Sequence, residues 1–121
     1  MKHYDVVVIG FGKAGKTLAK ELSSAGKRVA LIEQSAKMYG GACINTACIP
    51  SKTLLQEALK GHSFEEAMFR KNNVVQTLNQ KNYDNLAEQD NIGVASGKCG
   101  FTTIRNFQYK KPDFPSPKLR N

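Results

Sequence analysis

Two short apolar runs near the start of the chain have the pattern of strands buried on both faces of a parallel sheet. The first spans residues 5–9 and is rich in β-branched side chains, and the second spans residues 28–33 and ends in Glu33. Between them, residues 13–25 carry apolar side chains at helical spacing, and Gly26 stands where a helix C-terminal cap belongs. The pattern predicts a βαβ unit, whose crossover is nearly always right-handed.

The later part of the chain predicts two helices, a weak strand and an irregular tail. The helices are expected over residues 51–60 and from about residue 64 to residue 78, and the strand over residues 91–97. From Thr102 onward the apolar residues show neither helical nor strand-like spacing. Three of the four prolines lie in residues 111–118, where they disfavour both a helix and a central strand. The residues expected on the buried side of the first of these helices are Leu54, Leu55, Ala58 and Leu59.

Composition and charge argue against a membrane protein and against a nucleic-acid-binding protein. At 121 residues, with 40% hydrophobic and 23% charged residues, the chain fits one soluble globular domain. No apolar run approaches the roughly 20 residues that cross a bilayer, and the start lacks a secretory signal. We therefore expect a cytoplasmic protein with no membrane partner. The net charge of +8 is spread along the chain without an arginine-rich stripe, so we do not expect nucleic-acid binding.

The turn after the first predicted strand holds a G-x-G-x-x-G motif formed by Gly10, Gly12 and Gly15. The first glycine allows the tight turn, the second lets the backbone approach a pyrophosphate, and the third lets the helix pack close to the strand. Glu33 ends the next strand about 20 residues further on, where an acid binds a ribose hydroxyl. The motif indicates an adenine dinucleotide, either NAD or FAD, and disfavours NADP, whose 2′-phosphate would meet the carboxylate.

The same letters also satisfy the P-loop pattern, which would end in Gly15, Lys16 and Thr17. A P-loop needs an acidic partner from another strand beside its Mg²⁺. No later apolar strand ends in aspartate, whereas Glu33 stands where a dinucleotide site needs its acid. We therefore favour a dinucleotide site over a P-loop phosphohydrolase.

Cys43 and Cys48 follow the βαβ unit directly. A zinc site usually needs a second pair of ligands at similar spacing. The remaining cysteine and the two histidines do not supply such a pair, so we expect no metal site. Buried structural thiols are the commoner role of free cysteine in general. Here the pair lies at the start of a predicted helix, where thiols have a lowered pKa and react as thiolates. Beside a flavin, such a pair supports a dithiol–disulfide relay.

Residues 40–52 resemble the active-site segment of the class I pyridine nucleotide-disulfide oxidoreductases. These FAD flavoproteins include dihydrolipoamide dehydrogenase, glutathione reductase and mercuric reductase. The three loop glycines and Glu33 are in register with them, so the resemblance covers residues 4 to about 101. Residues 9–19 and 30–35 are most similar to the branch linked to reactive-chlorine resistance.

The resemblance implies an α/β fold with a Rossmann-like FAD-binding βαβ unit and a parallel sheet. It also implies that NAD(P)H reduces the FAD and that the flavin opens a Cys43–Cys48 disulfide. Cys48 would be the charge-transfer thiolate, and Cys43 the interchange thiol that passes electrons to a small-molecule, disulfide or metal-ion acceptor. Lys52 would stabilise charge near the flavin. The implied cofactor-binding residues are Gly10, Gly12, Gly15, Glu33, Gly41 and Lys52.

Two residues depart from the family pattern inside the cysteine segment. Ala42 stands where the family usually has threonine, and Ala47 where it usually has glycine. Ala42 therefore loses a hydroxyl near the cofactor. If the backbone at Ala47 needs a positive φ, its Cβ introduces a strain of roughly 1–2 kcal/mol.

A larger departure concerns parts of the family that have no counterpart in the chain. These are the second dinucleotide domain, which binds NAD(P)H, and the dimerisation domain of the family homodimer. We therefore expect a truncated or frame-shifted N-terminal fragment, inactive alone and weak in FAD binding. Residues 1–101 would form the first part of the FAD domain with its redox segment, and residues 102–121 a basic, proline-rich tail. The alternative is a stand-alone nucleotide-binding module with a redox-sensing thiol pair.

Overall fold

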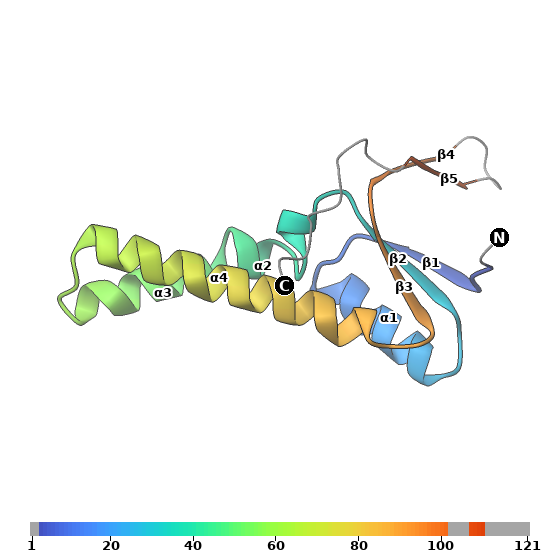
Figure 1. Cartoon of the computed structure of the whole chain (residues 1–121), viewed down its shortest axis with the longest axis horizontal. Coiled ribbons are helices and arrows are strands. Elements are labelled where there is room, and N and C mark those ends of the chain that lie inside the picture. Colours follow the sequence, from blue (N-terminus) through green and yellow to red (C-terminus); the bar gives the residue numbers. More distant parts are fainter. Residues whose placement is uncertain (1–2, 102–106, 111–121) are drawn as a thin grey trace, which may run out of the picture.

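The fold is an α/β arrangement built on a three-stranded parallel sheet (Figure 1). The computed structural model describes residues 3–101 and 107–110 of the chain. The sheet is formed by β1 (Val6–Ile9), β2 (Val29–Glu33) and β3 (Ile92–Ser96), with β2 in the centre. The other elements are α1 (Lys13–Ser24), the 3-10 turn η1 (Ala36–Met38), α2 (Ala42–Asn45), α3 (Cys48–Leu59), α4 (Phe64–Ala87), β4 (Lys98–Phe101) and β5 (Phe107–Lys110).

The βαβ unit predicted from the sequence is confirmed. β1 and β2 pair in parallel, with Val8 opposite Leu31, and α1 connects them. The predicted weak strand is β3, which pairs in parallel with the other edge of β2. Gly26 follows α1 with φ +80°, the left-handed conformation of the predicted cap. The carboxyl ends of β1 and β2 lie side by side, so the glycine loop leaves the sheet next to Glu33.

The core lies between the sheet and two helices. Ala19 of α1, Leu86 of α4 and Leu31 of β2 are buried in one cluster. β2 is buried along four of its five residues, as predicted for a strand covered on both faces. For β1 that prediction is wrong, because Val7 is 44% and Ile9 is 53% exposed. β1 is an edge strand, and one of its faces stays largely open in the described part of the chain.

α3 and α4 form a helical hairpin that extends beyond the sheet (Figure 1). α3 starts earlier than predicted, at Cys48, and α4 runs longer than predicted. The predicted buried side of α3 is largely wrong: Leu55 is 60% and Leu59 is 73% exposed, Ala58 is exposed, and Leu54 is half-buried. Within the described residues, α4 packs along only one side of α3, so the opposite apolar stripe of α3 is not covered.

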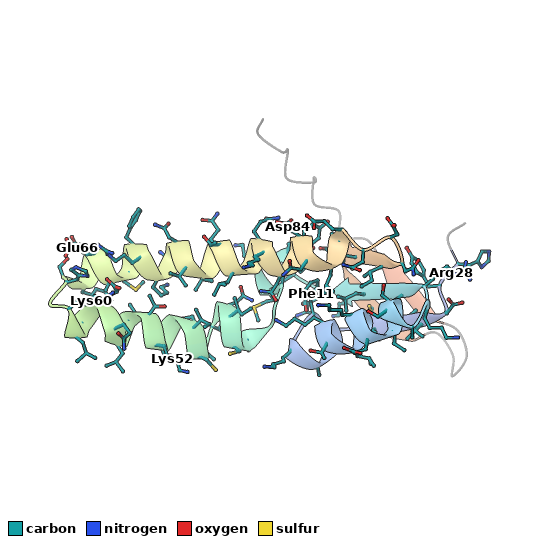
Figure 2. The ribbon with its side chains drawn as sticks, turned by 90° about the horizontal axis from the view of Figure 1, so that it is seen from below. Phe11, Arg28, Lys52, Lys60, Glu66 and Asp84 are labelled. Atoms are coloured by element: carbon teal, nitrogen blue, oxygen red, sulfur yellow. The ribbon has the colours of Figure 1, made fainter. Side chains whose placement is uncertain are left out.

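The buried residue of α3 is a charged one, Glu57. It lies three residues before Lys60, which Figure 2 shows close to the tip of the hairpin. The Glu57 carboxylate lies 2.9 Å from Lys60 Nζ, 2.5 Å from His62 Nδ1 and 3.3 Å from Arg70 Nε. Hydrogen bonds from Lys60 and His62 hold the pKa of Glu57 below its usual value. Because basic side chains from both sides of the turn compensate one buried carboxylate, electrostatic contacts fasten α3 to α4 at this end.

A second, small sheet is formed by β4 and β5, which pair antiparallel. β5 lies in the expected irregular tail, where the apolar residues showed no strand-like spacing. The rest of the expected tail, residues 102–106 and 111–121, lies outside the described residues. Within the part of the chain that the structure describes, no helix combines the length and the apolar character needed to cross a membrane.

Candidate functional site

The glycine loop joins β1 to α1, and the fold itself requires two of its glycines. Gly10 has φ +102°, a left-handed conformation that favours glycine, and its N–H donates to the Ile32 carbonyl at 2.7 Å. A Cβ at Gly15 would lie 2.0 Å from the Gly10 carbonyl oxygen. Only glycine therefore lets α1 pack this closely against the loop.

Gly12 is different, because no described protein atom requires a glycine there. Its φ of −76° and ψ of −177° suit any residue, and a Cβ built on it meets no atom within 4 Å. Gly12 is the N-cap of α1, and among the described residues no side chain caps this helix. The free backbone N–H groups and the helix dipole favour an anion at this end. The open space beside Gly12 therefore fits the pyrophosphate of a dinucleotide.

Glu33 lies at the end of β2, with its side chain turned toward the loop. Its carboxylate accepts a hydrogen bond from the Phe11 N–H at 2.9 Å and another from the Ser35 N–H at 3.3 Å. The acid is thus held against the backbone between Gly10 and Gly12. This is the position that the dinucleotide interpretation requires of it.

The segment that carries the cysteines begins against the same loop. The Gly40 N–H donates to the Phe11 carbonyl at 3.1 Å. Gly41 has φ +80°, and a Cβ built on it would lie 2.7 Å from the Gly12 Cα. Glycine at position 41 therefore allows the two segments to touch through backbone atoms. The fold brings Gly12 and Gly41 together although α1 and β2 separate them in the sequence.

A row of three aromatic rings, two of them buried, supports this junction. Phe11 is fully buried (Figure 2), and its ring centroid lies 5.0 Å from that of Tyr39. The Tyr39 centroid lies 4.9 Å from that of Tyr83 on α4, and the Tyr39 hydroxyl forms a hydrogen bond with Ser96 of β3. The row fixes the segment between β2 and α2 against the sheet and α4.

The two cysteines are close in space but belong to different helices. Cys43 lies in the short α2, Cys48 is the first residue of α3, and both are exposed free thiols. A hydrogen bond between their side chains raises the pKa of Cys43 above its usual value. The expectation of a lowered thiol pKa is therefore wrong for Cys43, because its contact with Cys48 outweighs the influence of nearby positive charge.

Two lysines supply that positive charge. Lys13 and Lys52 each act to lower the pKa of Cys43 through their charge, against the larger effect of Cys48. Lys52 lies on α3 (Figure 2), one turn after Cys48, and Lys13 is the first residue of α1. The sequence analysis expected Lys52 to stabilise charge near the flavin, and it missed Lys13. The position of Lys13 directly after Gly12, at the start of the predicted helix, is the feature of the sequence that could have indicated it.

Neither departure from the family pattern places a side chain at a positive φ. Ala47 has φ −125°, and no described residue other than glycine has a positive φ, so the conditional strain at Ala47 does not arise. Ala42 is exposed at the start of α2. Cys99 of β4 is half-buried, and burial raises the pKa of its thiol. The described residues contain no cluster of three or more His, Cys, Asp or Glu side chains placed to hold a metal ion.

Two asparagines of α4 also reach the site, and the sequence analysis missed both. Asn82 Oδ1 accepts a hydrogen bond from Lys16 Nζ at 2.6 Å, so the lysine of the P-loop pattern is turned toward α4. Asn79 Nδ2 donates to Asn45 Oδ1 at 3.0 Å. Asparagine on a helix normally marks its solvent-facing side, so no sequence pattern singled these residues out.

Comparison with known proteins places this geometry in a family. A family model described as pyridine nucleotide-disulphide oxidoreductase matches residues 4–111 of the chain. The chain belongs to this family. The match continues to residue 111, beyond residue 101, where we expected the resemblance to end.

Several oxidoreductases of this family are similar to the chain. The "Probable pyridine nucleotide-disulfide oxidoreductase RclA" of Escherichia coli (strain K12) is 51% identical over 113 residues, which cover 93% of this chain and 26% of the relative. A dihydrolipoyl dehydrogenase of Corynebacterium glutamicum is 46% identical over 63 residues, which cover 52% of this chain and 13% of the relative. A solved structure, the Cu(II) complex of the HOCl-induced flavoprotein disulfide reductase RclA from Escherichia coli, matches with a TM-score of 0.89 and 51% identity over 94% of this chain.

The comparisons confirm the predicted family and the Rossmann-like α/β fold with its parallel sheet. They also confirm the resemblance to the reactive-chlorine branch, since the similar solved structure is described as an HOCl-induced flavoprotein disulfide reductase. The chain spans about a quarter of the length of RclA, as 26% of that chain is covered. The roles of single residues and the electron acceptor stay predictions.

Proposed function

We propose that the chain binds FAD at the glycine loop and passes two electrons from the flavin to a disulfide between Cys43 and Cys48. The contact of Gly41 with Gly12 is the observation that carries this proposal. The loop suited to a pyrophosphate and the segment that carries the thiols touch through backbone atoms. A dinucleotide held by the loop therefore lies beside the cysteine segment.

The residues of the loop have separate tasks in this proposal. The N-terminus of α1 binds the pyrophosphate beside Gly12, where the backbone N–H groups are free for an anion. Glu33 keeps acceptor capacity for a ribose hydroxyl, because a carboxylate has about four acceptor sites and its two N–H partners occupy only some of them. Lys52 holds positive charge next to the redox pair. The bound FAD supplies a two-electron donor at this place.

The redox step takes place on the two sulfur atoms. Two electrons and two protons open the bond between Cys43 Sγ and Cys48 Sγ and leave two thiols. Both residues are exposed, so an acceptor can reach them from solvent. We assign Cys48 to the flavin side and Cys43 to the exchange with the acceptor. When the acceptor takes the electrons, the disulfide forms again and two protons are released.

The acceptor in this proposal is a small molecule, a disulfide or a metal ion. The Cu(II) in the solved structure of the RclA relative supports a metal ion as one candidate. The relatives carry about three quarters of their length outside the part that this chain shares. We place NAD(P)H oxidation and homodimer formation in those parts, and the flavin-to-disulfide step in the shared part.

FAD affinity of a Gly12→Asp variant tests the proposal. Aspartate adopts the backbone conformation of Gly12 and is a preferred N-cap residue, so the variant should be at least as stable as the wild type. Its carboxylate occupies the anion position, so titration by flavin fluorescence should show that FAD binding is lost. Asn73→Asp adds the same charge on the exposed side of α4 and should bind FAD like the wild type. Equal affinity in both variants, or no binding by the wild type, contradicts the proposal.

A further inference from the structure

The turn that carries Cys43 is bound to α4 by the hydrogen bonds of Asn79, in addition to the ring contact between Tyr39 and Tyr83. Asn79 Nδ2 lies 3.2 Å from the Ala36 carbonyl oxygen, 3.3 Å from the Tyr39 carbonyl oxygen and 3.0 Å from Asn45 Oδ1. These acceptors are spread along the chain from η1 to the last residue of α2. A single amide group of α4 therefore contacts three residues of the segment from η1 to α2, two before Cys43 and one after it.

Asn45 connects Asn79 to the backbone around Cys43 through further hydrogen bonds. Its own Nδ2 donates to the Tyr39 and Gly41 carbonyl oxygens, both at 2.8 Å. Carbonyl oxygens only accept hydrogen bonds, so they fix the orientation of the Asn45 amide and leave its Oδ1 to accept from Asn79. The two hydrogens of Asn79 Nδ2 are shared among three acceptors. Together, the hydrogen bonds of the two asparagines reach residues on both sides of Cys43.

α4 itself has anchors that do not involve Asn79. Leu86 of this helix is buried in the core, and Asn82 accepts a hydrogen bond from Lys16 Nζ of α1. Loss of the Asn79 amide should therefore leave α4 in place. Its effect should be confined to the freedom of residues 36–45.

We propose that Asn79 is a positioning residue for the Cys43–Cys48 pair. By holding the turn, it keeps Cys43 Sγ close to Cys48 Sγ, and a disulfide forms only within narrow limits of distance and orientation. Without the hydrogen bonds of Asn79, the turn samples more conformations. Closing the disulfide then costs more conformational entropy, because it must restrict the turn again. The inference rests on the proposed redox role of the pair.

The equilibrium between dithiol and disulfide tests the inference. The whole chain, with Cys99→Ser in every variant, is equilibrated with glutathione mixtures, quenched in acid, alkylated and weighed by mass spectrometry. Glutathione disulfide takes two electrons and two protons from the two thiols and becomes two glutathione molecules. In Asn79→Ala the equilibrium constant for disulfide formation should fall roughly five-fold, the change expected for one neutral hydrogen bond. Asn79→Ser, which also removes the amide, should give a similar fall.

Two further variants separate positioning from general stability. Asn79→Gln keeps an amide donor and should return the equilibrium toward the wild-type value. Asn72→Ala removes an exposed asparagine of the same helix and should change nothing. Unfolding by urea is measured beside the equilibrium, so that a change in stability alone is recognised.

The outcomes distinguish the two proposals. An equilibrium constant that is equal in the wild type, Asn79→Ala and Asn79→Ser overturns the inference, whatever the urea midpoints show. A wild-type chain that forms no Cys43–Cys48 disulfide in any glutathione mixture overturns the proposed redox function, and the inference with it. A fall in both Asn79 variants with recovery in Asn79→Gln supports the positioning role.

Discussion

The carboxylate of Glu33 accepts a hydrogen bond from the backbone N–H of Phe11 at 2.9 Å. The carbonyl of the same residue, Phe11, accepts from the Gly40 N–H at 3.1 Å. One buried residue thus connects the acid at the end of β2 with the segment that leads to Cys43. This connection is the structural reason for treating the nucleotide loop and the thiol pair as one site.

The glycine loop makes a prediction about stability. Gly15→Ala places a Cβ 2.0 Å from a backbone oxygen of the loop, so α1 or the loop must shift. Overpacking of this kind costs about 1–3 kcal/mol. Urea unfolding followed by circular dichroism measures the loss. Gly12→Asp is the matched control on the same loop, because its new side chain enters open space, and it should keep the wild-type midpoint or exceed it.

The thiol pair makes a prediction about reactivity. A raised pKa means that less of Cys43 is thiolate at a given pH, so removing the hydrogen bond in Cys48→Ala should lower this pKa and speed its alkylation. Lys13→Ala removes a positive charge that lowers the same pKa, so alkylation should become slower. Iodoacetamide rates across a range of pH, in a Cys99→Ser background, measure both effects. Lys20→Ala, an exposed lysine of α1, is the control, and a Lys13→Ala rate equal to it would refute the role of Lys13.

The tip of the hairpin makes a prediction about acid stability. The folded-state pKa of Glu57 is held below its usual value of 4.5. The carboxylate therefore contributes stability that is fully present above pH 4.5 and is lost as the pH falls through the folded-state pKa. Glu57→Gln should lower Tm at neutral pH, and the difference from the wild type should shrink in acid. Thermal unfolding against pH measures this, with the exposed Glu21→Gln as control. A difference that stays constant with pH argues against the account.

The parts of the fold that follow local patterns could be predicted from the sequence. α1 shows apolar residues at helical spacing, and β2 is a continuous apolar run, so each can be recognised from a short stretch of sequence. The spacing from the loop to Glu33 is fixed by the length of the βαβ unit. The contact of Gly41 with Gly12 could not be derived in this way, because it depends on how the chain returns after η1. The resemblance to a family named both glycines as cofactor-binding residues, but it did not predict their contact.

Other features depend on neighbours that a pattern does not show. Leu55 and Leu59 have helical spacing, but among the described residues α4 packs along a different side of α3, and the buried position belongs to Glu57. That burial needs His62 of the turn and Arg70 of α4. Asn79 looks like an ordinary surface residue until the turn with Asn45 folds against it. Each of these is a tertiary contact between residues whose local sequences carry no sign of it.

The central claim is that the glycine loop and the Cys43–Cys48 pair form one electron-transfer unit. The most direct measurement takes the chain with its disulfide formed, in a Cys99→Ser background, and adds reduced FAD without oxygen. Two thiols per chain should appear at a rate that saturates with the FAD concentration. Gly12→Asp should lose this saturation and react more slowly, while Asn73→Asp should match the wild type. Equal rates in the wild type and Gly12→Asp, rising in proportion to the FAD concentration, would contradict the claim.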